Sequence, residues 1–110
     1  MIEQHDIEIG QYILTIFERQ PGIVASWGLD PKTLRPIKAG IEFHVQGFKH
    51  TGTVRVILNE GEDLFEVSLI AESGETVETH ESIFLNELIS TIDDAVENVE
   101  NYEKRVAEIS

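Results

Sequence analysis

The sequence contains no cysteine, which excludes disulfide bonds and thiolate metal sites. It also lacks a run of about 18 consecutive apolar residues, which a membrane-spanning helix would need. The first six residues, Met1 to Asp6, have neither the basic region nor the apolar run of a signal peptide. We therefore expect a cytoplasmic protein that makes no contact with a membrane.

Basic side chains are scarce and unevenly spread. The chain has 8 lysine and arginine residues against 21 acidic ones, so its formal net charge is −13. Residues 56–103 contain no lysine or arginine, whereas five of the eight basic residues lie between Lys32 and Arg55. Because nucleic-acid affinity comes chiefly from neutralised phosphates, we expect no direct contact with nucleic acid. The acidic surface either keeps the protein soluble or meets a basic partner.

Motifs of known enzyme classes are also missing. The chain has no glycine-rich phosphate loop, no nucleophile elbow and no cysteine nucleophile. Glu42 and His44 share one face of a predicted strand, but zinc usually needs three or four ligands, and His80 is predicted three strands away. The acidic loop 59–63 lacks the ligand spacing of an EF-hand. We therefore predict neither a metal nor another cofactor.

The length of 110 residues suits a single domain, which we assign to residues 1–110. Its first apolar segment has helical spacing, with Asp6 as a candidate cap. A strand over residues 12–17 is the alternative, because Gly10 and several β-branched residues disfavour a helix. The residues that would share one helical face are Ile9, Tyr12, Ile13, Ile16 and Phe17.

The next segment, Ile23 to Leu29, is a short apolar run that we interpret as a strand or a buried extended stretch. Residues 30–36 are predicted to form a turn and loop, because two prolines there remove backbone donors. Trp27 is the only tryptophan, and it is expected to be a core or lid residue, with the lining of a ligand or partner site as the alternative.

From Gly40 onward the apolar period changes to two, which predicts an antiparallel meander of three to four strands. A turn with Lys49 opposite Gly52 sets Val45 against Val56 and Arg55 against Gln46, so that the apolar side chains share one face. The next hairpin sets Val56 against Phe65 and Val54 against Val67, and a third sets Val77 near Leu69. The fourth strand, from Glu75 to about His80, carries charges that suit a sheet edge.

The C-terminal third has apolar residues at alternating steps of three and four, which predicts one long helix from Leu85 to Ile109. Up to Val96 the apolar stripe is wide, as expected for a helix that packs on one face of a sheet. Twenty-five helical residues span about 37 Å, whereas a six-residue strand spans about 20 Å. The helix should therefore outrun its sheet and expose a narrow distal seam formed by Val99, Tyr102, Val106 and Ile109.

These patterns predict an α+β fold with an N-terminal helix, a meander and a long C-terminal helix. The leading hypothesis for its function is a non-enzymatic protein-interaction module, a homodimer or an adaptor, that uses the distal seam. One alternative is an acidic decoy that occupies the basic site of a nucleic-acid-binding protein. Another is a small ligand-binding domain or enzyme with a pocket near Trp27, Arg35 and Arg55. Phe48 is a further candidate contact, either in an exposed patch or beneath the segment 23–37.

Overall fold

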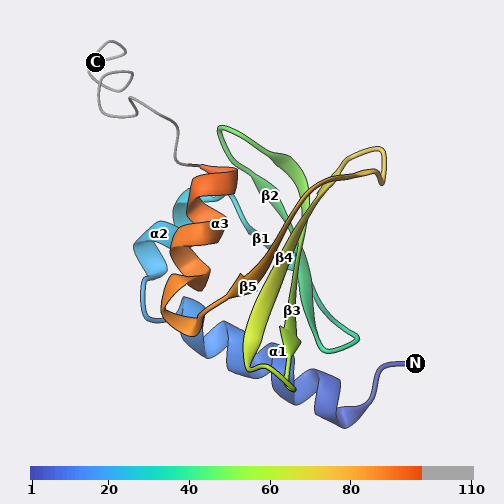
Figure 1. Cartoon of the computed structure of the whole chain (residues 1–110). Coiled ribbons are helices and arrows are strands. Elements are labelled where there is room, and N and C mark those ends of the chain that lie inside the picture. Colours follow the sequence, from blue (N-terminus) through green and yellow to red (C-terminus); the bar gives the residue numbers. More distant parts are fainter. Residues whose placement is uncertain (98–110) are drawn as a thin grey trace.

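A computed structural model describes residues 1–97 and confirms the α+β class. Two helices precede a five-stranded antiparallel sheet, and a short 3-10 helix and a last α-helix follow it (Figure 1). No helix within this range is long and apolar enough to cross a membrane. The elements are α1 Gln4–Phe17, α2 Pro21–Ser26, β1 Asp30–Ile37, β2 Gly40–Gln46, β3 Thr51–Asn59, β4 Leu64–Ala71, β5 Thr76–Ile83, η1 Leu85–Glu87 and α3 Leu88–Val96.

The N-terminal segment is a helix rather than a strand. α1 begins at Gln4, so Asp6 lies inside the first turn and not before it. Its carboxylate accepts a hydrogen bond from the Glu3 N–H at 2.9 Å and another from the Ala39 N–H at 2.8 Å. Asp6 therefore joins the start of α1 to the β1–β2 turn. The sequence did not indicate this role, because Asp6 and Ala39 lie 33 residues apart in the chain.

The segment 23–29 is not extended, and this prediction was wrong. Its first residues belong to α2, which has Pro21 in its first turn, where the missing N–H costs no hydrogen bond. Trp27 ends the helix, and Gly28 follows at a φ of +66°. A Cβ on Gly28 would lie 2.6 Å from the carbonyl oxygen of Gln46, because the chain crosses β2 closely there.

The predicted loop 30–36 is instead strand β1, which raises the strand count to five. The sheet order is β1-β2-β3-β4-β5, so β1 is an edge strand. An edge strand tolerates proline, since half of its N–H groups point away from the neighbouring strand. The pairing with β2 is also irregular between Asp30 and Arg35, in the stretch that follows Pro31.

The strand register differs from the predicted one, although the faces of β2, β3 and β4 are as expected. Val45 lies opposite Gly52 instead of Val56, a shift of four residues, because the β2–β3 turn is already closed at Gln46. Val56 lies opposite Val67 instead of Phe65, a shift of two. Even shifts leave each side chain on its original face.

The last hairpin deviates by one residue, which does change the face. Leu69 lies opposite Glu78, and a pairing irregularity between Leu69 and Ile70 displaces Val77. As a result Glu78 and His80 point to the side of the sheet on which Leu69 lies. β5 is nevertheless an edge strand, as its charges predicted.

The hydrophobic core of residues 1–97 lies between one face of the sheet and the helices (Figure 1). The helices contribute Ile9, Ile13, Ile16 and Phe17 from α1 and Leu88, Ile92 and Val96 from α3. The sheet contributes Ile41, Phe43, Val45, Val54, Val56, Phe65, Val67 and Leu69. β1 lies within the sheet, so the segment 23–37 forms no second layer over the opposite face. Within residues 1–97, that opposite face has no helical cover.

The C-terminal helix covers the sheet up to Val96, as its wide stripe predicted. It begins later than expected, because residues 85–87 form the 3-10 helix η1 and α3 starts at Leu88. The predicted distal seam of Val99, Tyr102, Val106 and Ile109 lies outside the described residues. Its role therefore stays a prediction.

Candidate functional site

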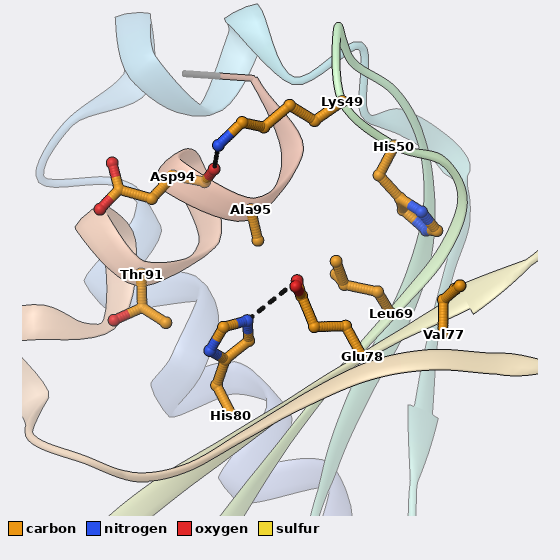
Figure 2. Close-up of a pocket in the computed structure, with 9 residues that line it drawn as sticks. All are labelled: Lys49, His50, Leu69, Val77, Glu78, His80, Thr91, Asp94 and Ala95. Atoms are coloured by element: carbon orange, nitrogen blue, oxygen red, sulfur yellow. Dashed lines mark hydrogen bonds and ion pairs between the residues drawn. The ribbon is translucent and has the colours of Figure 1, made fainter. Parts of the chain in front are cut away.

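One cleft in the described part of the chain lies between α3 and the β4–β5 hairpin (Figure 2). It has a volume of about 610 Å³. It exists because α3 covers the middle of the sheet, whereas the β4–β5 hairpin bends away from the helix (Figure 1). Its lining residues are Lys49, His50, Leu69, Val77, Glu78, His80, Thr91, Asp94 and Ala95.

The cleft combines a small apolar floor with a polar rim. Leu69, Val77 and Ala95 supply the apolar part. Figure 2 shows Glu78 and His80 rising from β5 toward α3, and His80 Nε2 lies 3.0 Å from Glu78 Oε2. This pairing orients the two side chains along the rim, where either can contact a ligand.

Lys49 closes the cleft at the end where α3 finishes. Its ammonium donates a hydrogen bond to the backbone carbonyl of Asp94, and its backbone N–H donates to the Val96 carbonyl at 2.8 Å. A cation at the C-terminal end of a helix is favourable, because the last carbonyl groups carry partial negative charge. Lys49 thus has a structural role in this cleft, whose acidic lining residues are Glu78 of β5 and Asp94 of α3.

The edge of β5 runs along this cleft and differs from the opposite edge of the sheet. β5 contains no proline, and among residues 1–97 only β4 pairs with it. β1 carries Pro31 and Pro36, which remove donors from the other edge. An edge strand that keeps its N–H groups can accept a further strand.

A row of polar side chains crosses the uncovered face of the sheet. Register pairs link Arg35 to Glu42, Glu42 to Arg55, Arg55 to Ser68 and Ser68 to Thr79, one residue from each strand. The row was partly foreseen, since Arg55 was expected on this face. Glu42 was also expected on this face, but the predicted register set Gln46 rather than Glu42 opposite Arg55.

Glu42 is the buried centre of this row. Its side chain is 6% exposed, and its two carboxylate oxygens each accept a hydrogen bond, Oε1 from Arg35 Nε and Oε2 from Arg55 Nε at 2.8 Å. Burial raises the pKa of Glu42, but the hydrogen bonds from Arg55 and Arg35 outweigh it and leave the pKa below its ordinary value. The carboxylate is therefore ionised and holds both guanidinium groups.

A second cleft, of about 320 Å³, opens beside this row. It is lined by Lys32, Thr33, Leu34, Arg35, Glu42, Phe43, His44 and Thr53. Three of the basic residues that cluster between positions 32 and 55 of the sequence thus meet here or next to it: Lys32, Arg35 and Arg55. The clustering of basic residues between Lys32 and Arg55 in the sequence was the signal that pointed to this site.

Trp27 does not lie near this site. It is fully buried in the core on the covered face, where its ring packs edge-on against Phe17 at a centroid distance of 5.5 Å. Its Nε1–H donates to Asp93 Oδ1 at 3.0 Å. The structure therefore brings Arg35 and Arg55 together, but it separates them from Trp27, which is a core residue and lines neither of the two clefts.

Phe48 lies in the β2–β3 turn, with 59% of its surface exposed. Its backbone N–H donates to Glu97 Oε2 at 2.9 Å, which ties the turn to the end of α3. This places Phe48 next to Lys49 rather than on the uncovered face. His44 and His80 lie on opposite faces of the sheet, and no cluster of three metal-ligating side chains occurs among residues 1–97.

Comparisons of the chain with protein-family models, with curated proteins and with solved structures find no match.

Proposed function

We propose that this protein is a non-enzymatic interaction module that binds an extended, basic segment of a partner protein along the edge of β5. The observation that carries this proposal is the proline-free outer edge of β5 beside the α3 cleft, with which no strand of residues 1–97 pairs. In this binding mode the segment adds a sixth strand, and main-chain hydrogen bonds supply affinity. Side chains on one face of the added strand would enter the cleft and contact Leu69 and Val77.

Charge supports a basic partner. Glu75, Glu78 and Glu81 lie on or next to β5, and residues 56–97 contain no lysine or arginine. Like charges discourage a second copy from pairing with this edge, since two acidic strands would lie side by side. A strand with lysine or arginine side chains would instead be attracted and steered to it.

Each of the three hypotheses drawn from the sequence has a different relation to this proposal. The acidic decoy is a special case of it, in which the basic segment belongs to a nucleic-acid-binding protein. The distal seam Val99 to Ile109 follows α3 in the chain and would add a second contact, to a partner or to another copy. The enzyme hypothesis receives no support from Trp27, because the indole is buried in the core.

The test uses a short peptide of alternating lysine and valine, with the intact protein labelled for NMR. We expect the largest amide shifts in β5 and α3, and an affinity that falls steeply with added salt. A peptide of alternating glutamate and valine should not bind. Shifts confined to other elements, or equal binding of both peptides, would contradict the proposal.

Matched charge reversals sharpen the test. Glu78→Lys should weaken peptide binding by about tenfold, since its charge adjoins the added strand. Glu62→Lys makes the same kind of change in the β3–β4 loop and should have a small effect. An equal loss in both variants would show that only the overall charge matters.

A further inference from the structure

The two arginines of the polar row are only partly used by the protein. Arg35 and Arg55 each contact Glu42 through Nε, and in the described part of the chain neither guanidinium group makes another hydrogen bond. The Arg35 side chain is 70% exposed and that of Arg55 is 48% exposed. The Nη donors of both groups are therefore available to a ligand.

Glu42 differs from an ordinary surface partner, because it is buried and both of its oxygens are occupied. A carboxylate in this position aligns the two guanidinium groups from either side. It neutralises only one of their two charges. The result is a pair of forked donors with excess positive charge, on a face that no helix among residues 1–97 covers.

Neighbouring charged residues set the net charge around Arg35 and Arg55. Lys32 lines the cleft and adds a third cation. Two acids also lie close: Asp30 accepts a hydrogen bond from the Lys32 backbone N–H, and Glu72 pairs with His44 Nε2. Asp30 and Glu72 are thus engaged with other groups, and within residues 1–97 the ion pairs of the two guanidinium groups are with Glu42.

We propose that Arg35, Arg55 and Lys32 bind a phosphate group, either free phosphate or the phosphate of a monoester, on the uncovered face of the sheet. Guanidinium groups bind phosphate through two parallel N–H···O bonds, and two arginines with a lysine match a tetrahedral dianion. The cleft of about 320 Å³ has room for the phosphate and a small attached group. Glu42 is the positioning residue of this site.

This site is independent of the proposed partner edge, because it lies on the other face of the sheet and on β1 to β3. Either proposal can therefore fail without the other. The direct test is an NMR titration of the intact protein with inorganic phosphate and with phosphoserine, at constant ionic strength. The shifts should follow residues 32–35, 42–44 and 53–55 and saturate by about 10 mM, the range of a weak Kd.

Arginine-to-lysine variants separate donor geometry from charge. Arg35→Lys and Arg55→Lys keep the charge but lose the fork, so each should lower the phosphate affinity by about tenfold. Arg19→Lys, an identical change just after α1, should leave the affinity unchanged. The absence of saturable binding to the unaltered protein overturns the proposal, and so does an equal affinity of all three variants.

Glu42→Gln tests the positioning role, because geometry and charge predict opposite results. Removal of the negative charge alone would strengthen phosphate binding. If Glu42 aligns the arginines, the affinity falls instead, and Glu42→Asp recovers part of it. A rise in affinity for Glu42→Gln would contradict the positioning role. The titration of the unaltered protein tests the site even where a variant does not fold.

Discussion

Trp27 Nε1 donates a hydrogen bond to Asp93 Oδ1 at 3.0 Å, across a chain separation of 66 residues. The indole is fully buried, and its ring also contacts Phe17 of α1. One side chain thus connects α1, α2 and α3 on the covered face of the sheet. This explains why the only tryptophan is an element of the core and not of a ligand site.

Asp93→Ala should destabilise the protein, because it leaves the buried indole N–H without an acceptor. The expected loss in the free energy of unfolding is about 1–3 kcal/mol. Asp93→Asn retains an acceptor oxygen and should cost less. Urea unfolding followed by tryptophan fluorescence measures both. Equal stability of Asp93→Ala and the unaltered protein would show that the hydrogen bond contributes nothing.

Gly47→Ala should loosen the contact between the β2–β3 turn and the end of α3. A Cβ on Gly47 would lie 2.3 Å from the Val96 carbonyl oxygen, so the backbone must shift. Overpacking of this kind costs about 1–3 kcal/mol. Gly22→Ala is the matched control, because no atom lies within 4 Å of its Cβ and alanine favours helix α2. In thermal unfolding, the Tm of Gly47→Ala should be lower than that of the unaltered protein, and the Tm of Gly22→Ala should be higher.

Acid should destabilise the protein through Asp6 and Glu42. Backbone hydrogen bonds from Glu3 and Ala39 lower the pKa of Asp6, and the two arginines lower that of Glu42 despite burial. A folded-state pKa below the unfolded one stabilises the fold at higher pH. This stabilisation is present above the unfolded pKa of about 4 and is lost as pH falls through the folded one.

The measurement is urea unfolding at several pH values from about 7 to 3. Asp6→Asn and Glu42→Gln should each flatten the decrease, since the substituted group no longer titrates. Stability that is independent of pH over this range, or an unchanged slope in both variants, would contradict the assignment of the acid response to these two carboxylates.

Tyr102→Asp tests the distal seam that the sequence predicts. If the seam binds a second copy, light scattering of the unaltered protein should give twice the mass of the chain, and the variant should be a monomer. Glu103→Gln changes a neighbouring position off the seam and serves as control. If the unaltered protein and Tyr102→Asp are both monomers, the homodimer is excluded, and the seam can bind only a different protein.

The sequence by itself determined the class of the fold and the face of most strands. Alternation in Ile41, Phe43 and Val45 assigns them to one side of the sheet whatever the register, because an even shift preserves the face. The spacing of Leu88, Ile92 and Val96 likewise defines the covered side of α3. Both patterns depend only on local geometry.

The tertiary structure decided what local pattern leaves open. Pro31 and Pro36 favour a loop in isolation, yet their position at the sheet edge permits β1, where a missing donor costs little. The pairing of Glu42 with Arg55 depends on the β2–β3 register, to which turn closure at Gly47 and contact with the end of α3 contribute. Its pairing with Arg35 depends on strand β1, which was predicted to be a loop. Hydrogen bonds between distant residues, such as Trp27 with Asp93, leave no period in the sequence. For that reason the buried carboxylate became apparent only in the folded chain, whereas the edge position of β5 was predicted from its charges.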